Sequence, residues 1–140
     1  MQVMALYEKG ITARQMMTKD SFRNALTADM ALGCSSNTIL HVPAIAHEAG
    51  VDIDLHDIND ISDHTPNLCH LAPAGHTFMC ELDDAGGVQA VLAELAKKKL
   101  IKTNMITATG KTIAQNIKNA VNRNPEILRP IDNPYSDNGG

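Results

Sequence analysis

Residues 21–50 have the sequence SFRNALTADMALGCSSNTILHVPAIAHEAG, which predicts two helices joined by a short loop. In the first helix, residues 21–32, apolar side chains recur every three or four positions and form one stripe beside a polar back. Gly33 is expected to end this helix, because glycine readily adopts the left-handed conformation that follows many helices. The second helix, residues 39–49, is apolar around most of its circumference, so we expect it to be central in the fold.

Ordinary helix and turn signals account for the rest of the chain up to residue 121. Asp54 is predicted to cap a short helix over residues 55–61, because an aspartate side chain accepts hydrogen bonds at a helix N-terminus. The remaining pattern predicts helices or helical turns at 2–9, 81–85, 88–99 and 111–121, and short extended elements at 67–71 and 106–108. The predicted fold class is therefore α/β, predominantly helical with a few short strands.

Residues 122–140 differ in composition from the preceding part of the chain. They contain three prolines, several asparagines and two glycines, and they show almost no hydrophobic periodicity. We therefore divide the chain into a helical α/β part, residues 1–121, and an extended linker or surface arm, residues 122–140.

The composition argues against several classes of function. The net charge is −4, whereas a nucleic-acid-binding protein needs a basic surface. No apolar run approaches the roughly 18 residues that cross a bilayer, and the N-terminal residues lack the features of a signal peptide. The three cysteines have no paired spacing that would indicate a disulfide framework. We expect a cytoplasmic protein with reduced thiols that binds neither nucleic acid nor a membrane.

Three patterns have the residue types of a ligand site but not its spacing. The aspartates between residues 52 and 63 resemble a calcium loop, yet Asp57 and Asp63 stand where that loop has glycine and glutamate. Helix capping and a solvated acidic face are the better interpretation. Gly110-Lys-Thr lacks the earlier glycine of a phosphate loop. Four further residues suit zinc chemically but match no familiar ligand spacing: Cys69, His70, His76 and Cys80. We therefore predict no metal ligand and no catalytic residue in this chain.

The loop between the first two helices has features of a binding site. Ser35, Ser36 and Asn37 precede a helix whose first N–H groups have no partner within the helix. Those N–H groups and the serine hydroxyls are suited to bind a carboxylate or a phosphate. The alternative is a tight connection in which these residues only cap the helix, as every helix start requires. We take Ser35, Ser36 and Asn37 as candidate substrate-binding residues.

Several segments carry a resemblance to a known enzyme family. Residues 31–41 (ALGCSSNTILH), 11–18 (ITARQMMT) and 66–75 (PNLCHLAPAG) are similar to segments of the dihydroxy-acid and sugar-acid dehydratases, and they follow in the same order. The resemblance extends over essentially the whole chain. Within residues 31–41, two positions depart from the family's segment: Cys34 stands where the family has glycine, and Ser36 stands where it has threonine.

The resemblance implies an internal piece of a dihydroxy-acid dehydratase, namely the C-terminal part of its N-terminal domain. The arm 122–140 would then lead to a second domain. Such an enzyme removes water from a 2,3-dihydroxy acid and yields a 2-keto acid for branched-chain amino acid biosynthesis. The resemblance also implies an iron–sulfur cluster and Mg²⁺ in a homo-oligomeric parent enzyme. It places their ligands and the catalytic serine outside this chain, so Cys34 is not expected to be a cluster ligand.

Two other interpretations remain open at the level of sequence. The first is a fragment of a sugar-acid dehydratase, which acts on 6-phosphogluconate or aldonates, although residues 66–75 and 81–87 resemble the dihydroxy-acid enzymes more. A non-enzymatic helical interaction module is the alternative from another class. Both ends of the chain look cut, because Met1 opens inside an amphipathic pattern and the final Asn-Gly-Gly is a turn signal. We expect the chain alone to be inactive, to expose apolar surface, and to self-associate or be only marginally stable.

Overall fold

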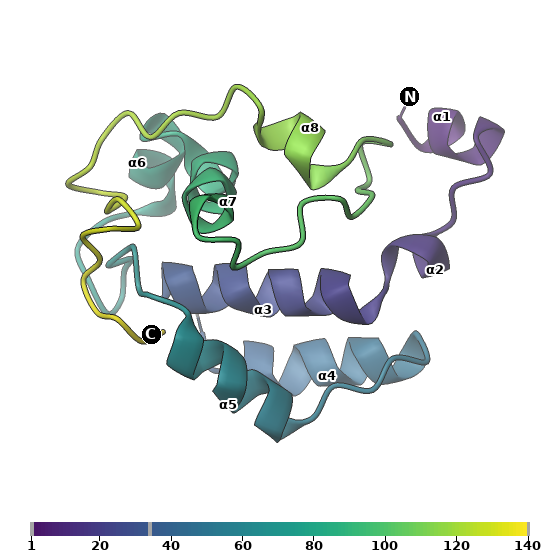
Figure 1. The fold of residues 1–140 in the computed structure, drawn as a ribbon, viewed down its shortest axis with the longest axis horizontal. Coiled ribbons are helices and arrows are strands. Elements are labelled where there is room, and N and C mark those ends of the chain that lie inside the picture. Colours follow the sequence, from purple (N-terminus) through teal and green to yellow (C-terminus); the bar gives the residue numbers. More distant parts are fainter. Residues whose placement is uncertain (1, 34, 140) are drawn as a thin grey trace.

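The computed structural model describes residues 2–33 and 35–139, and α-helices dominate this part of the chain (Figure 1). The helices have these bounds: α1 Gln2–Glu8, α2 Ala13–Met16, α3 Lys19–Leu32, α4 Thr38–Glu48, α5 Leu55–His64, α6 Met79–Asp84, α7 Gly87–Lys97 and α8 Ile113–Ile117. The prediction of a predominantly helical fold with short extended elements is confirmed. Among the described residues, no helix has both the length and the apolar character that crossing a lipid bilayer requires.

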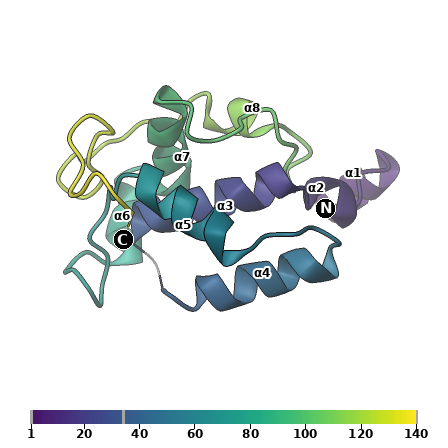
Figure 2. The ribbon, with the colours of Figure 1, turned by 60° about the horizontal axis from the view of Figure 1, so that its bottom comes forward.

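Helix α3 lies at the centre of the molecule, with α4 and α5 on one side and α6, α7 and α8 on the other (Figures 1 and 2). Its length is set by clear end signals. The Thr18 hydroxyl accepts a hydrogen bond from the Ser21 N–H, so the helix begins two residues earlier than the hydrophobic pattern predicts. Gly33 has φ 64° and ends it, as expected.

One stripe of α3 faces α4 and α5. Phe22, Leu26 and Met30 recur at intervals of four, so they lie on the same side of the helix. They form a buried cluster, here called the α5-side core, with these further residues: Ala46, Ile53, Ile58 and Ile61. Because a fully buried large apolar side chain contributes about 1.5–3 kcal/mol, this stripe fixes α5 firmly against α3.

A second stripe of α3 faces α7. Ala31 and Leu32 belong to a larger buried cluster, here called the α7-side core, which includes Leu82 of α6 and Ala90, Val91 and Leu95 of α7. Leu68, Leu128 and Ile131 also belong to this core, and they come from segments without helical structure. Helix α3 is therefore buried from two sides.

The prediction that residues 39–49 form the central helix is wrong. Only Ala46 of α4 is buried, and Leu40 is 70% exposed. The helix contacts α3 along one face, and its remaining apolar side chains face outward. The sequence pattern was misleading because a helix that is apolar on all sides can be covered either within its own domain or by another part of a larger protein.

The extended elements predicted at 67–71 and 106–108 appear as isolated bridges. Asn67 pairs with Ser136, Leu71 with Thr77, and Ile106 with Thr112. Residues 107–108 turn away after Ile106, so the predicted strand does not continue. Helix α8 is also shorter than the 111–121 prediction, and it begins after Thr112, whose hydroxyl accepts from the Gln115 N–H.

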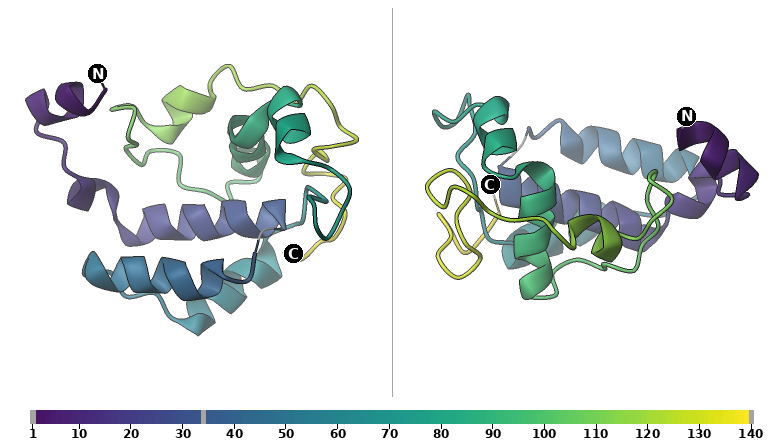
Figure 3. Two further views of the ribbon diagram at one scale, coloured as in Figure 1. Left: turned by 180° about the vertical axis from the view of Figure 1, so that it is seen from behind. Right: turned by 90° about the horizontal axis from the view of Figure 1, so that it is seen from above.

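The segment 122–139 packs along the end of the molecule formed by α3, α6 and α7 (Figure 3). Leu128 and Ile131 are buried in the α7-side core. The Ile131 N–H donates to Oε2 of Glu94, a buried carboxylate on α7, at 3.1 Å. The Arg129 N–H donates to the Leu68 carbonyl at 2.9 Å. This segment therefore contributes to the core, while the domain boundary at residue 121 stays a prediction.

Candidate functional site

The loop that joins α3 to α4 lies between two cavities. Gly33, at the start of this loop, has a positive φ of 64°, a backbone conformation that residues other than glycine rarely adopt. A Cβ atom at this position would also lie 2.9 Å from Nδ2 of Asn67. Glycine is therefore favoured both by the backbone conformation and by the close approach of Asn67. The prediction about Cys34 falls on a residue outside the described part of the chain.

The structure brings two of the three predicted site residues together. Ser35 and Ser36 line one cavity of about 190 Å³, here called the serine cavity. Its other lining residues come from α3, α4 and α5: Asp29, Met30, Ile39, Ile58, Asn59 and Ser62. Asn37 does not line this cavity, and its exposed side chain makes no capping hydrogen bond.

The backbone donors at the start of α4 are used within the loop. The Asn37 N–H donates to the Ser35 hydroxyl at 3.3 Å, and the Thr38 N–H donates to the Ser35 carbonyl at 3.0 Å. The Ile39 N–H donates to the Ser36 carbonyl at 3.1 Å. These contacts correct the expectation of several unpaired N–H groups, because the loop forms a tight turn that satisfies them. The groups left to bind a ligand are the serine hydroxyls.

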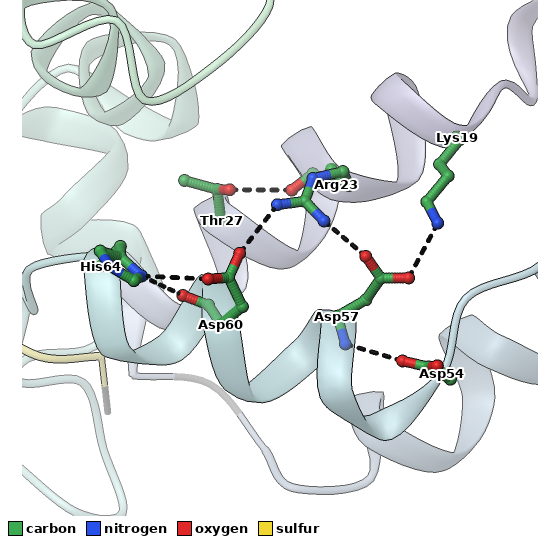
Figure 4. Close-up of polar contacts among 7 residues, drawn as sticks. All are labelled: Lys19, Arg23, Thr27, Asp54, Asp57, Asp60 and His64. Atoms are coloured by element: carbon green, nitrogen blue, oxygen red, sulfur yellow. Dashed lines mark hydrogen bonds and ion pairs between the residues drawn. The ribbon is translucent and has the colours of Figure 1, made fainter.

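A network of charged side chains holds α5 against α3 and so fixes two walls of the serine cavity (Figure 4). Arg23 of α3 donates to Asp57 at 2.6 Å and to Asp60 at 3.2 Å. Lys19 also pairs with Asp57, at 2.9 Å. Asp54 caps α5 by accepting from the Asp57 N–H, as predicted. Of the aspartates that resemble a calcium loop, Asp54 therefore acts in capping, and Asp57 and Asp60 act in ion pairs between helices.

The same network lowers the pKa of Asp57 below its ordinary value of 3.8. The largest cause is the hydrogen bond from the Lys19 ammonium, and the positive charges of Lys19 and Arg23 act in the same direction. Partial burial opposes them by disfavouring the charged carboxylate. Asp57 is therefore an anion throughout the neutral range, which keeps the contact between α3 and α5 intact.

The residues present do not fit an iron–sulfur cluster or a magnesium site. Within residues 2–33 and 35–139, no three side chains of His, Cys, Asp or Glu gather where they could hold a metal ion. Cys69 is buried and Cys80 is exposed. His70 stacks on Tyr135, with the ring centres 3.8 Å apart. A cluster requires several cysteine thiolates around one centre, so we derive no chemical step through a metal from these residues.

The second cavity lies beside Gly33 and Asn67 and has a volume of about 350 Å³; here it is called the Asn67 cavity. Its polar lining residues are Asn67, His70, Ser136 and Asn138. Sequence reasoning missed this site. The available signal was Asn67 itself, a polar residue at the start of the extended element predicted at 67–71, and the structure shows that it is buried.

Comparison with known proteins identifies the class of protein that carries this fold and loop. A family model described as dihydroxy-acid/6-phosphogluconate dehydratase N-terminal matches residues 1–116. The chain therefore belongs to the dihydroxy-acid/6-phosphogluconate dehydratase family, and the resemblance found in the sequence is confirmed.

Three similar proteins of this family share the name dihydroxy-acid dehydratase. The chain is 62% identical to a dihydroxy-acid dehydratase of Agathobacter rectalis, 58% to that of Clostridium beijerinckii and 59% to that of Lachnoclostridium phytofermentans. In each comparison, the match covers 100% of this chain and 25% of the relative. The chain thus spans about a quarter of the length of these relatives.

Proposed function

We propose that this chain is part of a dihydroxy-acid dehydratase, which removes water from a 2,3-dihydroxy acid and releases a 2-keto acid. The supporting observation is the 58–62% identity to three proteins of that name over the entire chain. An identity of this extent in an ordered series of motifs supports a shared substrate class more strongly than a shared fold would. A cytoplasmic, homo-oligomeric parent that uses an iron–sulfur cluster and Mg²⁺ is part of the same proposal.

Within such an enzyme, we assign residues 35–37 to one edge of the substrate pocket. Ser35 and Ser36 line the serine cavity, and their hydroxyls would serve as donors to a substrate oxygen. Asn37 extends this edge outside the cavity with an exposed amide. The ion pairs between α3 and α5 give the edge a fixed backing, which limits the entropy lost when a substrate is bound. The chain alone would be inactive, because the described residues supply no metal site.

The remainder of the parent would also cover apolar surface that is open in this chain. Val3 and Tyr7 of α1 are exposed, as are Leu40 and Ile45 of α4. Exposed apolar residues in such groups are typical of a surface that another part of the protein contacts. We therefore expect the isolated chain to self-associate or to be marginally stable. Sedimentation of the purified 140-residue chain as a strict monomer, together with a sharp two-state melt, would contradict this expectation.

The assignment of the loop is tested in the full-length parent with Ser36→Ala. Loss of one hydrogen bond to a substrate oxygen costs about 1–2 kcal/mol, which corresponds to a KM about 5–30-fold higher with 2,3-dihydroxyisovalerate. Ser21→Ala is the matched control, because it removes a serine hydroxyl at the other end of α3 and should leave KM unchanged. An unchanged KM for Ser36→Ala would remove this residue from the pocket.

A substrate comparison tests the activity itself. The full-length protein should convert 2,3-dihydroxyisovalerate to its keto acid and should act poorly on gluconate. Preferential turnover of gluconate or 6-phosphogluconate would identify a sugar-acid dehydratase, an assignment to which the family model also extends. Absence of both activities in the metal-loaded protein would refute the proposal.

A further inference from the structure

We propose that the segment 135–139 holds the loop and the walls of the serine cavity in place, with Tyr135 as its main positioning residue. Tyr135 does not line the serine cavity, and it acts through residues 67–70, the first two of which contact the end of α3. The inference rests on the proposed function of Ser35 and Ser36 at one edge of the substrate pocket. It adds to that pocket a residue from a distant part of the sequence.

Tyr135 is joined to residues 67–70 by its ring and by its backbone. The Tyr135 ring stacks on the His70 ring, with the ring centres 3.8 Å apart and the planes at 15°. The Tyr135 N–H donates to the Asn67 carbonyl at 2.9 Å, and the Asn67 N–H donates to the Ser136 carbonyl at 3.0 Å. Because a stacked aromatic pair contributes stability beyond the area that it buries, loss of the ring would loosen this pairing of the two segments.

Residues 67 and 68 in turn contact the start of the loop. The Leu68 N–H donates to the Ala31 carbonyl, in the last turn of α3, at 2.7 Å. Carbonyls in a last turn have no partner within the helix, so this bond satisfies one of them. The Asn67 amide packs against Gly33, where an added Cβ would lie 2.9 Å from Nδ2. A displacement of Leu68 and Asn67 would therefore move the residue from which the loop begins.

Tyr135 is itself fixed by the segment that precedes it. Its hydroxyl donates to the Glu126 carbonyl at 2.9 Å. The guanidinium carbon of Arg129 lies 4.9 Å from the Tyr135 ring centre, a distance at which a cation and an aromatic ring attract each other. The Arg129 N–H donates to the Leu68 carbonyl at 2.9 Å. Leu68 is thus bonded to α3 through its N–H and to residues 122–139 through its carbonyl.

The other end of the segment reaches the cavity walls directly. The Gly139 N–H donates to the carbonyl of Ser62, a lining residue of the serine cavity on α5, at 2.9 Å. A Cβ on Gly139 would lie 2.8 Å from the Cβ of Met30, which lines the same cavity from α3. The segment 135–139 therefore supports the site at two places, the start of the loop and the facing walls of α3 and α5.

The first test is steady-state kinetics of the metal-loaded full-length parent with 2,3-dihydroxyisovalerate. Tyr135→Leu removes the ring stack and should raise KM about 5–30-fold, the range expected for loss of one hydrogen bond from the loop to the substrate. Since the loop is proposed to bind the substrate without taking part in the chemical step, kcat should change less than about 3-fold. Tyr135→Phe keeps the ring and should retain the unmodified KM. Tyr7→Leu is the matched control, because Tyr7 is 78% exposed on α1.

A combined substitution separates positioning from a general loss of stability. In a background of Ser35→Ala with Ser36→Ala, the hydroxyls that Tyr135 is proposed to position are absent. Tyr135→Leu should therefore raise KM less than about 2-fold further in that background. A further increase as large as in the unmodified background would overturn the proposal. So would an unchanged KM in Tyr135→Leu where the serine variants raise KM, or an equal increase in Tyr135→Phe.

Hydrogen–deuterium exchange of the same full-length proteins tests the positioning without reference to catalysis. Peptides that span residues 30–41 should exchange about 3–10-fold faster in Tyr135→Leu, and at the unmodified rate in Tyr135→Phe and Tyr7→Leu. Unchanged exchange in Tyr135→Leu would overturn the proposal. Faster exchange, combined with an unchanged KM when both serines are replaced, would support the attachment through Tyr135 and refute the proposed function of the loop.

Gly139→Ala is the second variant, and it decides the matter if Tyr135→Leu does not fold. It leaves the ring stack intact, but its Cβ displaces Met30 and so shifts a wall of the serine cavity. We expect a higher KM, with faster exchange of residues 30–41. Asn138→Ala, at the exposed neighbouring position, is the control and should change neither quantity. Unchanged KM and exchange in Gly139→Ala would overturn the proposal.

Discussion

Replacement of Leu128 by alanine tests whether the segment after residue 121 is core or linker. Leu128 is fully buried, with 0% exposure, in the α7-side core. Removal of a buried leucine side chain beyond its Cβ costs about 2–5 kcal/mol, because the lost burial is compounded by the cavity left behind. A leucine in a solvated linker would instead change the free energy of unfolding by no more than about 0.5 kcal/mol.

The assay is urea unfolding of the 140-residue chain, followed by circular dichroism at a concentration low enough to avoid association. With a typical slope of about 1–3 kcal/mol per molar urea, a loss of about 3 kcal/mol lowers the midpoint by about 1–3 M. Leu55→Ala is the matched control, because Leu55 is 65% exposed and its truncation should be almost neutral. If Leu128→Ala is as mild as Leu55→Ala, the packing of residues 122–139 on the helices is refuted.

Three further substitutions test individual contacts by the same unfolding assay. Asp57→Asn should cost about 1 kcal/mol at neutral pH, since it removes the ion pairs that join α5 to α3. Because the pKa of Asp57 is lower in the folded chain, this stabilisation is present above pH 3.8 and is lost as the pH falls through the folded-state pKa. The difference in unfolding free energy between Asp57→Asn and the unmodified chain should therefore shrink in acid. A constant difference would contradict the assignment. Glu94→Gln should cost about 1–3 kcal/mol, because the buried Glu94 carboxylate accepts from two donors, Lys97 and the Ile131 N–H, and the amide replaces one acceptor oxygen with a donor. A neutral result would show that the carboxylate is not required. Asn24→Ala should cost about 1–2 kcal/mol, because it removes two hydrogen bonds, of 2.9 and 2.8 Å, between the Asn24 side chain and the backbone of Lys102. An unchanged urea midpoint would show that this buried side chain is not needed there.

Local pattern was sufficient to predict most of the helices, although α8 is shorter than predicted. The apolar stripe before Gly33 and the cap at Asp54 both appear in the structure, because a helix and its ends are set by residues within a few positions of each other. The ordered motifs were likewise sufficient to indicate the family, which the comparisons confirm.

Only the tertiary structure decided which helix is central and which residues share a cavity. Periodicity shows that α4 is apolar but not which part of the protein covers it, and in this chain α3 takes the central place. The Asn67 cavity combines Gly33, Asn67 and Ser136, which are separated by more than thirty residues at each step. The burial of Leu128 depends on equally distant partners, in α7 and near Leu68. Such contacts leave no local period in the sequence, because they are selected by the shape and hydrogen bonding of surfaces that meet only after the chain has folded.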